Sequence, residues 1–547
     1  MKEKNLTEAT IDPQPAGTFV DLFCGCGGFT LGMMRAGYKC LAAIDFDPHA
    51  VDALRTNLKD VGHVLQRDLT TCSPEEIEQI IGTSTVDVIV GGPPCQGFST
   101  ARQRDGSNHG DRLKEDSRRL LYKEFFKFID HFKPKVFVME NVLGIKSAAG
   151  GKYFASVQSD ARSIGYCVHG QVEKAWELGV PQKRRRQLII GTRNDIPQYF
   201  MPQLEPAPRA IRGTKLGHAI ADLPELTSGS GSDEALYDLD LRDKAISKRC
   251  ELTKNYLEKV LEIHCAEKLT NHVARPHNER DLHDFNLLNE GENSAVAMRE
   301  HGVVFKFPYN KNSFKDRYTR QSRYDYCSTI VAHLSKDGLM FVHPTQLRSI
   351  TPREAARIQS FPDWFRFPKA RTHSFRMIGN AVPPLVAESV GLAIKKYLQK
   401  ERDMNHAIIS NSSAATIPKS GQEAVDCLLQ TVAMSKTSLK ALSTPSFLKA
   451  WAAVAYLYPG LHPDGACEKG SLVHVDNDES DLPASLVSPY YEISGWPLVL
   501  VPLAEEAWRR HENGELKENE LYHCDAQAAG INSRAVKSSV DKEPAYI

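Results

Sequence analysis

Short apolar runs alternate with segments of helical periodicity along roughly the first two hundred residues of the chain. Apolar runs of this length predict buried strands, and apolar residues at helical spacing predict helices with one buried face. An alternation of the two is typical of a parallel sheet covered by helices on both faces. We therefore expect a doubly wound α/β domain, with strands at residues 18–22, 40–45, 87–90, 136–139 and 188–191 and helices at 31–37, 50–58, 120–131 and 153–164.

The alternation stops near residue 196 and returns near residue 346. Between these points the sequence is polar and loop-rich, with a Gly-Ser run at 228–232, which predicts a smaller irregular domain at 196–345. Thr351 and Glu354 form a possible capping box for a helix at 349–360, and a last helix is expected at 384–398. We expect residues 1–195 and 346–400 to build one domain. A linker at 403–422 then begins a C-terminal extension, 401–547, whose role the sequence does not indicate.

Composition excludes several classes of protein. The apolar fraction is 41% and the charged fraction is 25%, which is ordinary for a globular chain and argues against wholesale disorder. No signal-like N-terminus and no run approaching ~20 apolar residues is found, so we expect a cytoplasmic protein without membrane association. The net charge is zero, but residues 401–547 carry about −8, which leaves about +8 for residues 1–400. The basic part is the candidate for contact with nucleic-acid phosphates.

A glycine-rich turn follows the first expected strand. Gly25, Gly27 and Gly28 permit a tight turn and close approach of the backbone to a ligand. Thr30 stands where a dinucleotide-binding fingerprint requires its last glycine, so the motif for binding a pyrophosphate is incomplete. The next strands end in acids, at Asp45 and Asp68, which suits a nucleoside cofactor without a pyrophosphate. The alternative is that both aspartates only cap the following helices.

The residues that suggest a reaction stand at two further strand ends. Pro93 and Pro94 fix the backbone before Cys95, at the carboxyl edge where open α/β sheets bind ligands. A lone cysteine is more often an inert buried residue, but this rigid setting favours a reactive one. Glu140 ends the neighbouring strand and is expected to be partly desolvated beside Cys95. A basic run, 182–186, precedes the strand at 188–191, and it is either an anion-binding element or a solvated basic surface.

These segments, in this order, resemble the DNA (cytosine-5) methyltransferase family of the bacterial restriction-modification type. The resemblance spans residues 17–400 and rests on several motifs together, since each alone is only suggestive. The motifs are DLFCGCGG from Asp21, GPPCQGFS from Gly92, ENV from Glu140, QKRRR from Gln182, RSITPREAARIQSFP from Arg348 and IGNAVPP from Ile378.

The resemblance implies a Rossmann-like catalytic domain that uses S-adenosyl-L-methionine, with 196–345 as a target-recognition domain. It implies that Cys95 is the nucleophile, that Glu140 contacts the base, and that Arg184 and Arg186 support the site. The residues implied to bind the cofactor are Phe23, Gly25, Cys26, Gly27, Gly28, Asp45, Phe46, Asp68, Leu69, Pro93 and Asn380. Those implied to bind the substrate are Pro94, Gln96, Ser99, Asn141 and Gln182.

The implied substrate is double-stranded DNA, and a polar loop at 98–117 is expected to close over a flipped base. The resemblance also suggests a monomer with a possible cognate restriction endonuclease encoded nearby. We expect no metal, because His272, His277 and His283 do not have the spacing of a ligand set. The rival interpretations are a transfer-RNA cytosine-5 methyltransferase, whose usual Cys-Phe-Thr signature is missing, an amino-methyltransferase, and a catalytically silent DNA-binding regulator.

Overall fold

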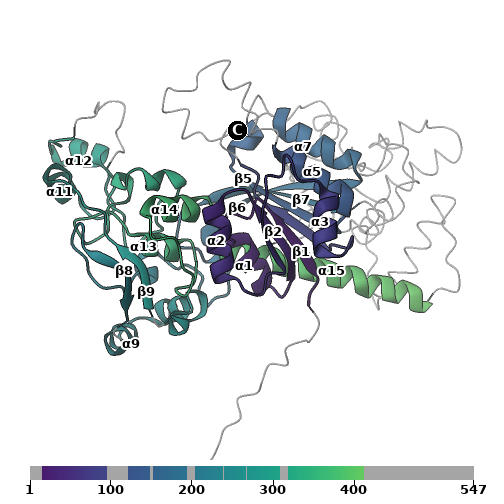
Figure 1. Cartoon of the computed structure of the whole chain (residues 1–547). Coiled ribbons are helices and arrows are strands. Elements are labelled where there is room, and N and C mark those ends of the chain that lie inside the picture. The colour runs from purple at the N-terminus through teal and green to yellow at the C-terminus, as the bar shows by residue number, and fades with distance from the viewer. Residues whose placement is uncertain are drawn as a thin grey trace, which may run out of the picture. The chain divides into compact units, whose positions relative to one another are not determined.

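The structure is a computed structural model that describes residues 15–94, 121–147, 152–193, 204–307 apart from 238 and 267, and 318–411. Figure 1 shows the elements in these ranges. The chain divides into two units, and the larger one contains Met1–Ile164, Gly170–Gly191 and Leu204–Lys395. The smaller one contains Gly165–His169, Thr192–Gln203 and Lys396–Ile547. The site described below belongs to the larger unit.

A seven-stranded sheet forms the centre of the α/β part, in the order β3-β2-β1-β4-β5-β7-β6. The pairs from β3 across to β5 are all parallel. The chain order reverses between β1 and β4, and such a switch point leaves a crevice at the carboxyl ends of the strands. The predicted doubly wound α/β class is confirmed. The strands are β1 (Thr18–Leu22), β2 (Lys39–Asp45), β3 (His63–Gln66), β4 (Val88–Gly91), β5 (Val136–Asn141), β6 (Tyr166–Lys174) and β7 (Arg185–Arg193).

Helices connect these strands where the apolar spacing predicted them, and α3 and α6 are present in addition. On α5, for example, Phe125, Phe126 and Phe128 are buried, and Phe125 and Phe126 meet Phe137 of β5 edge to face. This packing supplies much of the hydrophobic stabilisation of that part of the sheet. Neither α3 nor β6 was expected. The helices are α1 (Gly28–Arg35), α2 (Pro48–Asn57), α3 (Pro74–Ile81), α5 (Leu121–Phe132), α6 (Gly144–Ser147) and α7 (Lys152–Ser163).

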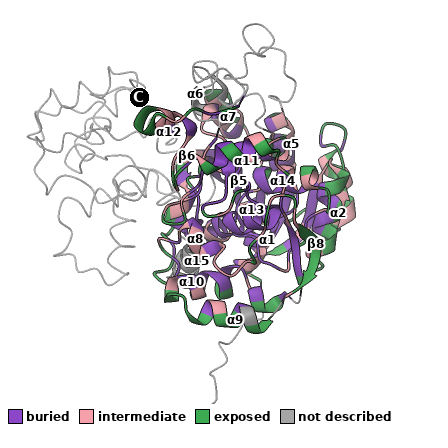
Figure 2. Cartoon of the chain, turned by 90° about the vertical axis from the view of Figure 1, so that its left-hand side faces the viewer, coloured by how far each residue is buried: buried purple, intermediate pink, exposed green. Residues whose placement is uncertain are grey.

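The region expected to be irregular contains more regular structure than its sequence suggests. Two antiparallel strands, β8 (Gly231–Leu236) and β9 (Lys268–Val273), form a separate small sheet. Figure 2 shows β8 as largely exposed and α13 as buried. Short helices make up much of the remainder: α8 (Leu216–Ala219), α9 (Leu239–Ser247), α10 (Glu251–Asn255), α11 (Glu279–Asn286) and α12 (Ser294–His301).

Helices α13 (Pro352–Ile358), α14 (Arg371–Asn380) and α15 (Pro384–Asn411) follow. The predicted capping box is present, since Thr351 accepts a hydrogen bond from the Glu354 amide and Glu354 accepts one from the Thr351 amide. Helix α15 packs on α1 without space for a side chain at Gly32, where a Cβ would lie 2.4 Å from the Pro384 carbonyl oxygen. Helix α15 also continues to Asn411, so the first nine residues of the expected linker are helical.

One segment near the end of the described residues is long and apolar. By length and composition alone, Arg371–Gln399 would pass as a membrane-spanning helix, but 72% of its most apolar window is buried inside the protein. Core helices commonly meet the same criteria. We attribute its apolar character to packing, as at Gly32 on α1.

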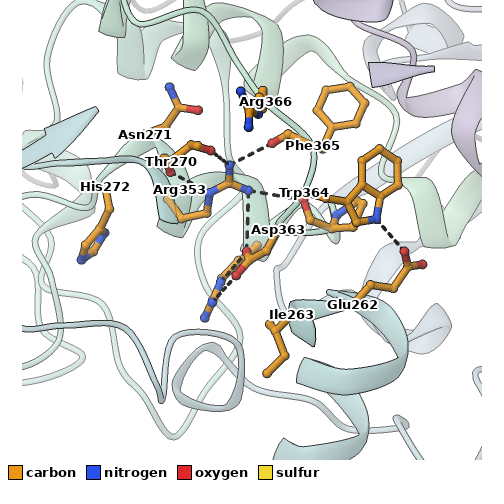
Figure 3. Close-up of polar contacts among 12 residues, drawn as sticks. Glu262, Ile263, Thr270, Asn271, His272, Arg353, Asp363, Trp364, Phe365 and Arg366 are labelled. Carbon is orange, nitrogen blue, oxygen red and sulfur yellow. Dashed lines mark hydrogen bonds and ion pairs between the residues drawn. The ribbon is translucent and has the colours of Figure 1, made fainter. Parts of the chain in front are cut away.

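Buried arginines of α13 join this helix to the region of β9. Figure 3 shows the Arg353 guanidinium between β9 and the residues that follow α13. Its Nε donates to the Thr270 carbonyl at 2.9 Å, and its Nη2 donates to the Phe365 carbonyl at 2.8 Å. Asp363 lies 3.6 Å from Nη1. Because the Arg353 side chain has no exposed surface, these partners replace its water shell.

Candidate active site

The glycine turn between β1 and α1 needs glycine for two different reasons. Gly25 and Gly27 have φ angles of 54° and 92°, in the left-handed region where a side chain causes strain. Gly28 is constrained by packing, because a Cβ there would lie 2.3 Å from the Val382 carbonyl oxygen. Nothing lies within 4 Å of the Cβ position at Gly25, so among these three only Gly25 borders open space in the described structure.

Two buried groups lie under this turn. The carboxyl group of Asp21 accepts a hydrogen bond from the Thr30 hydroxyl at 2.6 Å, and burial raises its pKa to about 7. The Cys26 side chain is also buried, which raises the pKa of its thiol to about 12. A thiol that stays protonated is a poor nucleophile. Cys26 therefore contributes packing to the turn and not chemistry.

The two predicted acids do not cap helices with their side chains. The carboxylate of Asp45 accepts from the Gly25 amide at 2.8 Å and from the Asp47 amide at 2.9 Å, and burial raises its pKa. The exposed carboxylate of Asp68 accepts from the amide and hydroxyl of Thr70. Helix α2 is capped by Asp47 and helix α3 by Ser73. The capping alternative is wrong for both predicted acids.

An aromatic ring and an apolar side chain accompany these acids at the strand ends. Phe46 follows β2 and is 63% exposed, which is unusual for a phenylalanine next to a buried strand. Leu69 is buried beside Asp68. Each carboxylate oxygen can accept more than one hydrogen bond, so Asp45 retains capacity for a ligand hydroxyl. An exposed ring, acceptor oxygens and an open glycine together fit a nucleoside.

The end of β4 lies beside Glu140. A Cβ at Gly92 would be 3.6 Å from Glu140 Oε2, and the Asn141 side chain donates to the Pro93 carbonyl at 3.5 Å. Pro94 is the last described residue before a gap. Cys95, Gln96, Ser99 and the expected loop at 98–117 lie outside the described residues.

Glu140 is the second-last residue of β5 and is 8% exposed, so the expected partial desolvation is confirmed. Its Oε1 lies 2.8 Å from Arg186 Nε and 3.8 Å from Arg184 Nη2. Among the described residues no donor forms a hydrogen bond with Glu140 Oε1. The contact with Arg186 is therefore an ion pair that lacks hydrogen-bond geometry. A carboxylate that is buried, charge-paired and still able to accept can bind a polar ligand edge.

The basic run at 182–186 is not a solvated surface at Gln182, Arg184 and Arg186, which are buried or partly buried. The fully buried Arg184 donates to the carbonyls of Ile330, Gly379 and Ala381 at 3.2, 3.2 and 2.9 Å. Arg186 is the one that contacts Glu140 directly. The intervening residues, Lys183 and Arg185, are exposed. The alternation across the start of β7 therefore directs Arg184, just before the strand, and Arg186, within it, inward.

Gln359, for which the sequence predicted no role, belongs to the same network. The buried Gln182 side chain donates to Gln359 Oε1 at 2.5 Å and accepts from the Ile330 amide at 3.0 Å. Gln359 in turn donates to the Ile378 carbonyl at 2.5 Å. The sequence signal that could have identified Gln359 is a polar amide side chain within the otherwise apolar part of the RIQSFP motif. Asn380 ends α14 and is exposed, so the structure leaves it accessible at the edge of this network.

Metal binding has no support in the described ranges. Among these residues no group of three or more His, Cys, Asp or Glu side chains could hold a metal ion. His272 is instead hydrogen-bonded to Thr351 and to the Pro224 carbonyl, and His277 to Ser349. These histidines join buried segments and leave no shared site.

Comparisons with known proteins agree with this arrangement. Residues 17–396 match the family model for C-5 cytosine-specific DNA methylases. The type II methyltransferase M.DdeI of Desulfomicrobium norvegicum is 34% identical over 407 residues, which cover 72% of this chain and 91% of that protein. The type II methyltransferase M.AgeI of Thalassovita gelatinovora is 32% identical over 439 residues, 69% of this chain and 98% of that protein.

Solved structures give the same result. A putative DNA modification methyltransferase encoded within a prophage of E. coli has a TM-score of 0.53 and 26% identity, over 70% of this chain and 99% of that one. The match to the family model covers more than half of the sequence and includes every motif named above. The chain therefore belongs to the C-5 cytosine-specific DNA methylase family, and it is a DNA (cytosine-5) methyltransferase.

Proposed function

We propose that this methyltransferase moves a methyl group from S-adenosyl-L-methionine to carbon 5 of a cytosine that is flipped out of a specific duplex DNA sequence. The proposed route passes through a covalent adduct between Cys95 and the base. One observation carries it: the 8% exposed Glu140 lies beside Gly92, three residues before Cys95. The strand that leads to the thiol and the strand that bears the carboxylate thus end side by side.

The residues at the ends of β1, β2 and β3 are suited to the cofactor. S-adenosyl-L-methionine would supply an electrophilic methyl group on a sulfonium sulfur. The exposed Phe46 ring offers a stacking surface for the adenine, and Asp45 offers an acceptor for a ribose hydroxyl. Asp68 is exposed, and we assign it to accept a hydrogen bond from the adenine amine. Phe23, Leu69, Pro93 and Asn380 complete the proposed binding set.

Carbon 5 of cytosine is a weak nucleophile, so the base must be activated before it accepts a methyl group. In the proposed step the Cys95 thiolate forms a bond to carbon 6, while Glu140 stabilises a proton on ring nitrogen 3. The electron pair of the resulting enamine forms the carbon 5–methyl bond as the methyl–sulfur bond breaks. Loss of the carbon 5 proton then restores the ring double bond and expels Cys95.

Arg186 and Arg184 have different parts in this proposal. Arg186, at 2.8 Å from Glu140 Oε1, holds one carboxylate oxygen and leaves Oε2 on the side of Gly92. Arg184 is 3.8 Å away and holds the segment 379–381. A base entering this site must leave the duplex, at a cost of a few kcal/mol. We propose that Pro94, Gln96, Ser99, Asn141 and Gln182 line its pocket.

Trapping with duplex DNA that contains 5-fluorocytosine tests the covalent step. Fluorine at carbon 5 cannot leave as a proton does, so an active Cys95 should leave a complex that survives denaturing electrophoresis in the presence of the cofactor. Cys95→Ala should abolish that complex. If the wild-type protein methylates ordinary DNA but forms no such complex, the covalent route is wrong.

The role of Glu140 is tested by separating binding from chemistry. Glu140→Gln keeps the shape of the side chain but removes its charge, so methyl transfer should slow by a factor of roughly a hundred or more. Cofactor affinity, measured by calorimetry, should stay within about twofold of the wild type. Loss of cofactor binding in this variant would contradict the assigned role.

Domain roles and partners are part of the same proposal. Residues 1–195 and 346–400 would form the catalytic domain, and 196–345 the target-recognition domain that reads base edges. The type II names of its relatives support a restriction-modification role. We further propose that the enzyme acts in the cytoplasm as a monomer and that a cognate endonuclease is encoded nearby. Bisulfite sequencing of DNA from cells that express the protein would identify the modified base and its sequence context. Complete absence of new 5-methylcytosine would instead favour the silent regulator.

A further inference from the structure

The exposed Phe46 ring stands between two aspartates that are both held in place. Before it, Asp45 accepts hydrogen bonds from the amides of Gly25 and Asp47. After it, Asp47 caps α2 by accepting from the His49 amide at 3.0 Å. The second carboxylate oxygen of Asp47 lies 2.6 Å from Nη2 of Arg376, which belongs to α14. An unbroken series of contacts therefore leads from α14 to the glycine turn.

The side of α14 that provides Arg376 also contacts the start of α2. His373 and Asn380 are three residues before and four residues after Arg376, so the three side chains share one helix face. The rings of His373 and His49 are 4.0 Å apart at their centroids. Nδ1 of His373 lies 3.4 Å from Arg376 Nη2. The helix that ends in Asn380 is thus joined to the start of α2 through two neighbouring pairs, Arg376–Asp47 and His373–His49.

We propose that Arg376 is a positioning residue for the methyl-donor cofactor: by pairing with Asp47 it fixes the 45–47 turn that presents the Phe46 ring. This inference rests on the proposed binding of S-adenosyl-L-methionine at that ring. Arg376 does not touch the cofactor in this proposal. It acts through Asp47, and it ties the cofactor turn at the end of β2 to the helix that carries Asn380.

Exposure explains why the pair should affect binding more than folding. The Arg376 side chain is 43% exposed and that of Asp47 is 19% exposed. A pair this open to water adds little to global stability, because screening and side-chain entropy offset its attraction. A binding turn held in its bound conformation, however, avoids an ordering cost when the ligand arrives. Loss of the pair should therefore appear mainly in cofactor affinity.

The experiment uses the full-length protein and S-adenosylhomocysteine, the demethylated product, as the calorimetric probe. Arg376→Met removes the charge and keeps much of the side-chain volume, and Arg376→Lys retains the charge. Asp47→Asn removes the opposite charge but remains a good helix cap, since asparagine caps as well as aspartate. Arg55→Met is the matched control on α2, where Arg55 lies 3.9 Å from the exposed Asp52.

We expect Arg376→Met and Asp47→Asn each to raise the Kd of the probe roughly three- to tenfold. The KM for the cofactor should rise similarly, while kcat, the KM for DNA and Tm change little. The double variant should be no weaker than either single variant, since one pair is lost in each case. Arg376→Lys should recover most of the affinity, and Arg55→Met should bind as the wild type does.

Two outcomes would overturn the inference: unchanged affinity in both single variants, or independent and additive losses in the double variant. Phe46→Ala separates such a failure from a failure of the proposed cofactor site. If Phe46→Ala weakens binding and Arg376→Met does not, only the positioning role is wrong. If the wild type and Phe46→Ala bind the probe equally, the cofactor site itself is misassigned.

Discussion

The buried cluster around Arg357 supports a quantitative prediction. The Arg357 side chain has no exposed surface, and it forms ion pairs with Asp222 and Asp363, each only 1% exposed. Its Nε donates to Asp363 at 2.8 Å, its Nη1 to Asp222 at 2.5 Å and its Nη2 to the Tyr237 hydroxyl at 3.0 Å. Arg357→Met would remove one positive charge and leave two carboxylates buried without it.

Removing one member of a buried pair typically costs about 3–5 kcal/mol, because the remaining charge loses its partner and gains no water. Arg353 lies 3.6 Å from Asp363 and compensates in part on that side. We therefore expect the free energy of unfolding to fall by about 4 kcal/mol. The matched control is again Arg55→Met, whose pair with Asp52 is 51% and 74% exposed and should contribute less than about 1 kcal/mol.

Urea unfolding followed by circular dichroism measures both variants under the same conditions. Arg357→Met should lower the midpoint strongly and Arg55→Met hardly at all. Introducing Arg357→Met into a protein that already carries Asp222→Asn and Asp363→Asn should cost much less than in the wild type, because no unpaired charge is then created. Equal midpoints for Arg357→Met and Arg55→Met would refute the reasoning.

Three further predictions concern the glycine turn and the cysteines. Burial raises the pKa of Asp21 to about 7 from 3.8, so its contribution to stability is full below about pH 4 and is lost as the pH rises through 7. In the wild type the free energy of unfolding should therefore fall by about 4 kcal/mol between pH 4 and 8 on account of this group, and Asp21→Asn should abolish that part of the fall; an unchanged pH profile of Tm would contradict this. Gly28→Ala places a Cβ 2.3 Å from a backbone carbonyl and should lower Tm more than Gly82→Ala, where nothing lies within 4 Å and only the left-handed φ of 71° opposes a side chain. The reverse order in thermal melts would count against the packing. Iodoacetamide at pH 8 should modify the exposed Cys250 and spare Cys26, whose pKa burial raises to about 12, as peptide mass spectrometry can check.

The centre of the sheet was predictable because β1, β4 and β5 are buried on both faces and read as continuous apolar runs. Strand β1 begins and ends where the sequence indicated, and β5 is longer by only its two polar residues, Glu140 and Asn141. Strand β6 was missed because its second half alternates polar side chains, from His169 to Lys174, and resembles a loop. Propensity and periodicity carry little information where a strand lies at the edge of the sheet, as β6 does.

The candidate site was predictable as a set of strand ends, and its contacts were not. Parallel topology brings the ends of β4 and β5 together, which the order of the motifs already implied. The different partners of Arg184 and Arg186 could not be predicted from the sequence, because Arg184 donates to carbonyl groups 146 to 197 residues away in the chain. Such partners are fixed by tertiary packing and leave no local signal.

These long-range contacts join the two halves of the site. Arg184 lies 3.8 Å from the Glu140 carboxylate and donates to the Ala381 carbonyl. The next residue, Val382, meets Gly28 of the cofactor turn so closely that no side chain fits there. The segment 379–382 therefore contacts the proposed methyl-donor turn directly, and Arg184 links it to Glu140, the proposed base contact. Since packed segments shift as units, a displacement of this segment should disturb both ends of the proposed transfer together.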